Sequence, residues 1–175
     1  MTVIILAGPP AVGHNTIGEL LGQLRPRFAV IDVDDVRAME RSPAPDPWEG
    51  QAGEERYRRS IRRACLIARD FDKDGYDVVV LDVAPPETLD LFRAELAGLS
   101  ALKIVLLLAD PEILIERDVA RDETPDPDPG AIASWHDRIR FLHGQLAEAA
   151  GSYDVVIDNG RMTAEETAEK VAALF

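Results

Sequence analysis

The chain has 175 residues, 46% of them hydrophobic, and its 32 acidic side chains outnumber the 19 basic ones to give a formal charge of −13. This length suits one domain with its own core. An acidic surface repels nucleic acids, the first apolar run is too short to span a bilayer, and the single cysteine cannot form an intramolecular disulfide. We therefore expect a cytoplasmic protein with a single domain over residues 1–175 and with neither a nucleic acid nor a membrane as partner.

Five short apolar runs, rich in β-branched residues, recur along the chain at 3–7, 29–31, 78–81, 104–108 and 155–157. They are continuous, as is typical of strands buried on both faces of a parallel sheet. Helical patterns separate them at 16–24, 54–71, 87–96, 112–121 and 132–149. A last helix begins at Thr163, which has capping-box spacing to Glu166. This alternation predicts a three-layer α/β fold with right-handed crossovers.

Two proline-rich segments, 41–53 and 122–130, interrupt the pattern. Proline fits neither a helix interior nor a central strand, so both segments are predicted to be surface loops. Loops of this length inside a domain often carry function.

A glycine frame follows the first predicted strand. The segment reads Gly8, Pro9, Pro10, Ala11, Val12, Gly13, His14, Asn15 and Thr16, and a helix pattern comes next. Two glycines five apart between a strand and a helix match the phosphate-binding loop G-x-x-x-x-G-K-[ST]. Backbone N–H groups and the positive end of the helix dipole hold a phosphate in such a loop. We therefore predict that residues 8–16 bind a nucleotide; the alternative is a corner whose glycines serve only the turn.

The last positions of this frame depart from the pattern. His14 stands where lysine is expected, and Asn15 where serine or threonine is expected. Histidine is shorter than lysine and only partly charged at neutral pH, although a bound phosphate favours its charged form. Asn15 offers a carbonyl oxygen as a weaker Mg²⁺ ligand, and Thr16 lies one residue late. The frame therefore predicts either an altered phosphotransfer site or one that has lost catalysis.

Beyond the loop, the chain resembles the small P-loop kinases and phosphotransferases, a group that includes adenylate, shikimate and gluconate kinases and chloramphenicol phosphotransferase. The resemblance spans nearly the whole chain and rests on the order and spacing of five segments. They are residues 8–13, 33–37, 75–82, 113–121 and 156–166. It implies a five-stranded parallel sheet in the order 2-3-1-4-5 flanked by helices, an acceptor-binding loop at about 37–60 and a small lid at about 117–140.

The same resemblance implies an acid after the second strand that receives the proton of the acceptor. Asp34 is the first candidate and Asp35 the second, with Asp32 also in the segment. Asp82, at the end of the third strand, would hold Mg²⁺ together with Asn15 or contact the substrate. For each of these acids the alternative is a helix cap.

Arginines of the lid would stabilise charge on the transferred phosphoryl group, because a guanidinium fork matches its oxygens. Arg121 and Arg117 are the first candidates and Arg138 follows. Asn159 lies where adenine rests in the group. Candidate acceptor contacts are Arg37, Trp48, Arg56, Tyr57, Trp135 and His136. Packing in the core or on the surface is the alternative for the aromatic residues.

The resulting hypothesis is a phosphotransferase that uses ATP or GTP with Mg²⁺ and acts on a hydroxyl of a small molecule, as a monomer or homodimer. A nucleotide-binding or ligand-sensing pseudokinase and a small nucleotide hydrolase are the alternatives.

Overall fold

The computed structural model describes residues 1–121 and 129–175, and for residues 129–131 it describes the backbone alone. One sheet holds five parallel strands in the order β2-β3-β1-β4-β5. The strands are β1 (Val3–Ala7), β2 (Phe28–Asp32), β3 (Asp77–Asp82), β4 (Leu102–Leu108) and β5 (Val155–Asp158). The predicted strand order is therefore confirmed.

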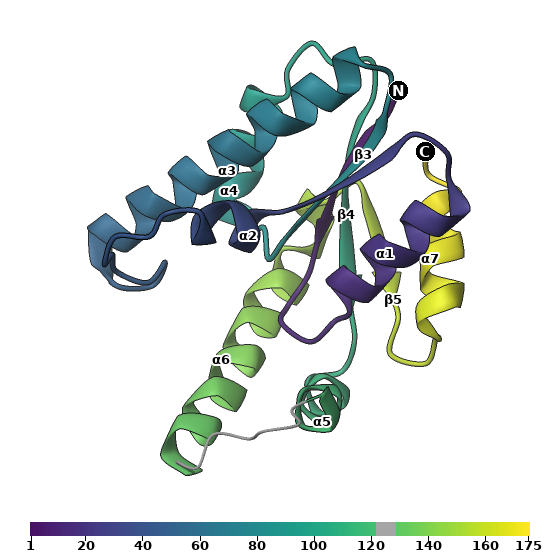
Figure 1. Ribbon diagram of the computed structural model, residues 1–175. Helices are drawn as coiled ribbons and strands as arrows, with labels where there is room; N and C mark the ends of the chain where they lie inside the picture. The colour runs from purple at the N-terminus through teal and green to yellow at the C-terminus, as the bar shows by residue number, and fades with distance from the viewer. Residues whose placement is uncertain (122–128) are drawn as a thin grey trace.

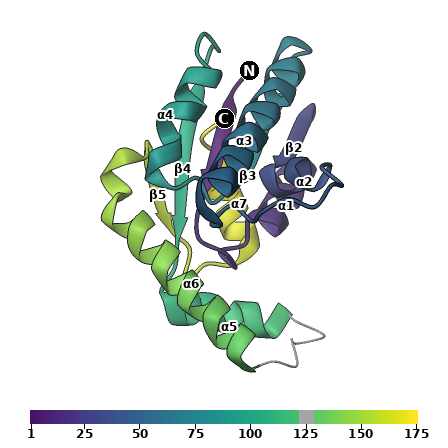
Figure 2. The ribbon, with the colours of Figure 1, turned by 90° about the vertical axis from the view of Figure 1, so that its left-hand side faces the viewer.

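Helices cover both faces of this sheet. They are α1 (His14–Leu24), α2 (Val33–Ala38), α3 (Gly50–Lys73), α4 (Pro86–Glu95), α5 (Pro111–Arg121), α6 (Pro129–Glu148) and α7 (Ala164–Ala172), with a 3₁₀ turn at Ala150–Ser152. Figure 1 shows α1 and α7 on one side of the sheet and α3 and α4 on the other. Turned by 90°, the molecule shows α5 and α6 extending beyond the sheet (Figure 2). The predicted three-layer fold is confirmed.

The central strand explains why the apolar runs are continuous. All five side chains of β1 are buried. Ile4 and Leu6 belong to the core cluster on the side of α1 and α7, whereas Val3 and Ile5 belong to the cluster on the side of α3. The edge strands alternate instead, and Val30 on β2 and Val156 on β5 are exposed. A strand covered on both faces needs apolar residues at every position.

Several bounds differ from the predicted ones. Helix α3 begins at Gly50, so the predicted acceptor loop 37–60 is irregular only at 39–49. Helix α6 begins at Pro129, inside the predicted loop 122–130, because proline is tolerated in the first turn of a helix. Residues 122–128, in the predicted lid, lie outside the described residues. The capping box of Thr163 and Glu166 at the start of α7 is confirmed.

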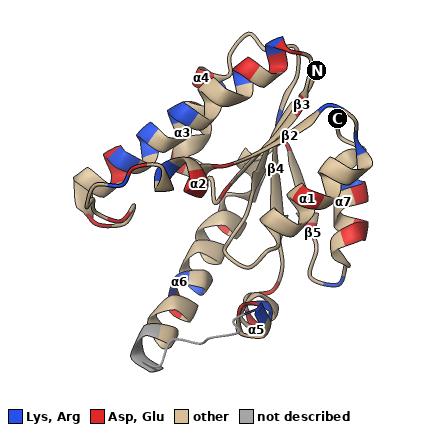
Figure 3. Ribbon diagram, viewed as in Figure 1, with Lys and Arg blue, Asp and Glu red and all other residues tan. Residues whose placement is uncertain are grey.

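Arginines of α3 hold the segment 39–49 in place. Figure 3 shows basic residues along this helix. Arg56 donates to Glu40 Oε2 at 2.9 Å and to the carbonyl of Pro45 at 3.2 Å, and Arg63 also pairs with Glu40. The two guanidinium groups lower the pKa of Glu40 to about 2. Among residues 1–121 and 129–175, no helix is long and apolar enough to cross a membrane.

Candidate active site

A cavity of about 840 Å³ opens at the carboxyl ends of the strands, as expected for an open parallel sheet. Its walls come from the loop after β1, from α2, α3, α5 and α6, and from the loop after β5. Predicted site residues that line it are Pro10, Ala11, Val12, Gly13, His14, Asn15, Thr16, Asp34, Arg37, Trp48, Asp82, Arg117, Arg121, Arg138 and Asn159. Gly8, Pro9, Asp35 and Arg56 were predicted as site residues but do not line this cavity.

The loop after β1 requires its two glycines for different reasons. A Cβ on Gly8 would lie 2.8 Å from the carbonyl oxygen of Leu107 and 2.9 Å from Val12 Cγ1, so the strand next door leaves no room for a side chain. Gly13 has a φ of 105°, a conformation that side chains disfavour, and it directly precedes α1. The first turn of α1 holds no acidic residue, so its backbone N–H groups offer an anion site.

His14 is a half-buried residue of the cavity wall. Its Nε2 is buried and has no hydrogen-bond partner among the described residues, and it would be 3.1 Å from a Cβ on Gly8. Burial lowers the pKa of His14 to about 4, and the carbonyl of Ala7 and the carboxylate of Asp34 offset this only in part. The pKa of His14 therefore lies below the unperturbed value on which the expectation of partial charge rests, because desolvation outweighs the nearby negative groups.

Asn159 ties three parts of the site together. Its Nδ2 donates to the carbonyl of Val12 at 2.9 Å, while its own carbonyl accepts from Arg117 Nη2 at 2.9 Å. The loop after β5 thereby links helix α5 to the loop after β1. Asn159 is buried, and its Oδ1 finds no donor within the described part of the chain.

Asp82 is a buried acid at the end of β3. Its Oδ2 accepts from Tyr57 Oη at 2.6 Å and from the N–H of Ala84 at 3.1 Å. Burial raises the pKa of Asp82 to about 7, and the charge of Asp34 acts in the same direction. Burial also raises the pKa of Tyr57 well above its usual value. A cation that enters the cavity would favour the charged form of the Asp82 carboxyl group.

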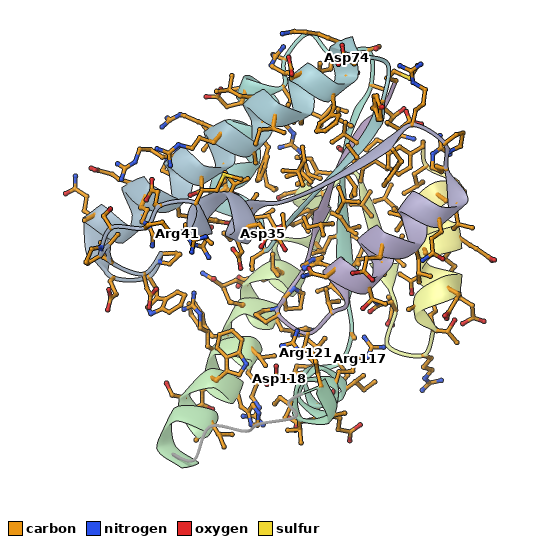
Figure 4. The ribbon with its side chains drawn as sticks, viewed as in Figure 1. Asp35, Arg41, Asp74, Arg117, Asp118 and Arg121 are labelled. Atoms are coloured by element: carbon orange, nitrogen blue, oxygen red, sulfur yellow. The ribbon has the colours of Figure 1, made fainter. Side chains whose placement is uncertain are left out.

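Two of the three acids after β2, Asp32 and Asp34, line the cavity, and Asp32 also caps a helix. Asp32 accepts from the N–H of Asp34 at 2.7 Å and caps α2, so the helix-cap alternative holds for Asp32. Burial and the charges of Asp34 and Asp35 raise the pKa of Asp32. Asp34 pairs with Arg37 at 2.7 Å and lines the cavity, with its side chain 71% exposed. Asp35 is on the same short helix, labelled in Figure 4, but outside the cavity wall.

The three lid arginines have different surroundings. Arg117 and Arg121 are on α5, beside Asp118 (Figure 4). Arg121 is largely exposed and pairs with Asp118 Oδ1 at 3.1 Å. Arg138 on α6 lies over the ring of Trp48, 3.9 Å from its centroid, and burial lowers the pKa of Arg138.

Some residues in or next to the cavity wall were not among the predicted site residues, and one of them, Asp118, contacts two lining residues without lining the cavity itself. Asp118 accepts from Trp135 Nε1 at 3.1 Å as well as from Arg121, and so joins α6 to α5. Met162, Thr163 and Thr167 line the wall next to Asn159. Thr163 was recognised only as a helix cap. Asp118 carries a signal in the sequence, since it lies three residues before Arg121 on one helical face.

Asp82 and Asn15 both line the cavity and can serve Mg²⁺. Within residues 1–121 and 129–175, no group of three or more His, Cys, Asp or Glu side chains could hold a metal ion. Mg²⁺ in phosphotransfer sites keeps several waters and takes one or two protein ligands beside the phosphates. The oxygen donors present fit that kind of site.

Solved structures with the same fold cover almost the whole chain. A tunicamycin resistance protein of Deinococcus radiodurans matches with a TM-score of 0.66 and 19% identity, over 99% of this chain and 94% of that one. The shikimate kinase of Acinetobacter baumannii in complex with shikimate matches with a TM-score of 0.66 and 20% identity, over 99% and 92%. The APS kinase of Mycobacterium tuberculosis in complex with AMPPNP and APS matches with a TM-score of 0.67 and 16% identity, over 99% and 96%.

No family model matches the chain, and no curated protein matches it in sequence. The fold therefore defines the class: the protein has the fold of the small P-loop kinases. The predicted resemblance is confirmed at the level of the fold.

Proposed function

We propose that the protein is a nucleotide-dependent phosphotransferase that acts on a hydroxyl group of a small molecule. The observation that carries this proposal is one cavity whose wall includes residues 10–13 of the glycine frame, the start of α1, acids of α2 and β3, and arginines of α5. Phosphotransfer needs little more from a protein than positioning and charge stabilisation, and these groups provide both.

The roles follow from the position of each group. The N–H groups of the loop and of α1 bind the nucleotide phosphates, and Arg117 and Arg121 stabilise charge on the oxygens of the transferred group. Asp34 takes the proton of the acceptor hydroxyl as its oxygen bonds to the γ-phosphorus and the bond to the β-phosphate oxygen breaks. Asp82 and Asn15 would hold Mg²⁺ beside the phosphates, and the ion would supply neutralising charge there.

A nucleotide-binding pseudokinase is the second candidate, and the state of His14 favours it. A buried imidazole with a pKa of about 4 is neutral at physiological pH, so the loop lacks the cation that usually reaches the β- and γ-phosphates. In the phosphotransferase, the lid arginines supply that charge. In the pseudokinase, nucleotide binds without turnover.

Calorimetric titration with ATP and GTP, with and without Mg²⁺, tests the proposal on the native protein and on His14→Lys. Micromolar, Mg²⁺-assisted binding by the native protein, followed by phosphate transfer in an acceptor screen, supports the phosphotransferase. Native binding with no transfer to any acceptor supports the pseudokinase. If the native protein does not bind nucleotide and the lysine variant does, both candidates are wrong. The protein then keeps the fold but has no nucleotide-dependent function.

A further inference from the structure

The cavity has a second end, away from the loop after β5 and bounded by the β3 side of the sheet. We call it the acceptor end and define it by six lining residues: Pro47, Trp48, Tyr57, Pro85, Trp135 and Leu142. Trp135 and Leu142 belong to the same face of α6 as Arg138, three residues before it and four after it, and Arg138 lies on Trp48. The acceptor end therefore joins α3, α6 and the segment 39–49.

Large apolar surfaces remain uncovered at this end. The side chains of Trp48 and Trp135 are 54% and 37% exposed, although both line a cavity. Burying the exposed surface of such indole rings against another apolar or aromatic surface is energetically favourable. Of the four remaining members, two prolines and a leucine add apolar wall without hydrogen-bonding side chains, and the hydroxyl of Tyr57 is already bonded to Asp82. This end is shaped for a molecule with an apolar body.

The arginines near the acceptor end already have negative partners. Arg37 pairs with Asp34 at 2.7 Å. Arg56 is turned to Glu40 and does not line the cavity. Arg138 has one face on Trp48 and is close enough to Asp46 for its charge to be favoured by that acid.

Three carboxyl groups on this side belong to the cavity wall: Asp32, Asp34 and Asp82. An anionic group placed here meets these acids and must displace Asp34 from Arg37 before it gains an ion pair. A neutral or amino-bearing molecule meets no such opposition.

From these contacts we infer the chemical class of the acceptor, on the basis of the proposed phosphotransfer: a hydroxylated molecule with an apolar, aromatic-sized body that is neutral or carries an amino group, and not an anion. The aromatic wall holds the body, and Asp34 faces the hydroxyl. The acids of α2 and β3 exclude carboxylate, sulfate or phosphate groups on the acceptor. Specificity arises as much from this repulsion as from the apolar contact.

Intrinsic fluorescence tests the inference directly, because the chain has two tryptophans and both belong to the acceptor end. The full chain is titrated at neutral pH with three probes that share one ring: benzyl alcohol, 4-(aminomethyl)benzyl alcohol and 4-(hydroxymethyl)benzoate. We expect the first two to bind at least about tenfold more tightly than the carboxylate. Equal or tighter binding of the carboxylate, or no quenching by any probe up to about 10 mM, overturns the inference.

A matched pair of variants locates the cause. Asp34→Asn releases Arg37 and is expected to tighten binding of 4-(hydroxymethyl)benzoate about tenfold while benzyl alcohol changes little. Asp35→Asn removes the same charge one residue away, outside the cavity wall, and is expected to change neither. If both variants tightened binding of the carboxylate probe equally, Asp34 would not be the residue that opposes anions in the cavity.

These titrations need neither nucleotide nor turnover, so their failure is distinguishable from failure of the proposed function. A protein that binds and transfers phosphate but prefers the carboxylate probe has the proposed function with a different acceptor. A protein that selects the neutral probes but never binds nucleotide has the inferred acceptor end without the function.

Discussion

The two ends of the cavity are built from different materials. One end is formed by residues 8–16, and we call it the phosphate end because we propose that it binds phosphate. It is shaped by the main chain: Gly8 lets two strands approach, Gly13 takes a positive φ, and α1 presents its N–H groups. At the acceptor end, side chains of α2, α3, α6 and the segment 39–49 form the wall. A site made of backbone is fixed by the fold and tolerates an unusual residue such as His14. A site made of side chains can change its ligand without a change of fold.

The largest effect is expected from the acid at the boundary between the two ends. Asp34→Asn removes the group that takes the acceptor proton, and kcat should fall by about 10²- to 10⁴-fold, the usual contribution of a positioned base. Asp35→Asn, outside the cavity wall, serves as the control and should leave kcat within about twofold. Steady-state rates with one acceptor measure both, and similar losses in the two variants would show that Asp34 acts only through the charge of α2.

The second prediction concerns the pH dependence of stability, which His14 and Asp82 should change in opposite directions. Burial lowers the pKa of His14 from 6.5 to about 4, so the stability gained from its neutral form is complete above pH 6.5 and is lost as the pH falls towards 4, a change of about 3 kcal/mol. Burial raises the pKa of Asp82 from 3.8 to about 7, so its ionisation destabilises the fold as the pH rises through this range.

Urea unfolding of the native protein, His14→Asn and Asp82→Asn between pH 4 and 7.5 checks both shifts. Relative to the native protein, His14→Asn should become more stable as the pH falls, whereas Asp82→Asn should become more stable as the pH rises. Difference curves that are flat, or that slope the same way, would contradict the burial of one or both groups.

Substitution of Gly8 should disturb only the phosphate end of the cavity, and substitution of Gly53 only the acceptor end. Gly8→Ala forces a methyl group against Leu107 and Val12 and should weaken nucleotide binding about thirtyfold, or about 2 kcal/mol. Gly53→Ala places a Cβ 1.9 Å from the carbonyl oxygen of Asp46 and should displace the segment that carries Trp48. We expect this variant to lose acceptor affinity by a similar factor while calorimetry finds nucleotide binding unchanged. If either variant lost affinity for both nucleotide and acceptor, each measured alone, the substitution would have disturbed both ends of the cavity.

The smallest effect is a gain. Gly22 lies inside α1, and a Cβ there would have no neighbour within 4 Å among the described residues. Gly22→Ala should therefore stabilise the protein by about 0.5–1 kcal/mol in urea unfolding and leave both ends of the cavity unchanged. A destabilised variant would show that α1 is packed differently from the arrangement described.

The sequence predicted the parts of the molecule that depend on regular spacing. Strand β1 is apolar at every position because it is covered on both faces, and Gly8 and Gly13 are five apart because the loop between them has one shape. Spacing could not choose among Asp32, Asp34 and Asp35, because all three suit the start of α2. Only the tertiary structure places Asp32 and Asp34 in the cavity wall and leaves Asp35 outside it. Spacing also could not predict that the Nε2 of His14 is buried close to Gly8.

Asp118 has a consequence for the order in which ligands bind. Its carboxylate accepts from Arg121, which lines the cavity, and from Trp135, which belongs to the acceptor end. Under the proposed function, a shift of Trp135 on contact with an acceptor would reach, through this one side chain, an arginine proposed to meet the nucleotide. The two substrates would then be thermodynamically linked: by whatever factor one changes the affinity for the other, the second changes the affinity for the first by the same factor.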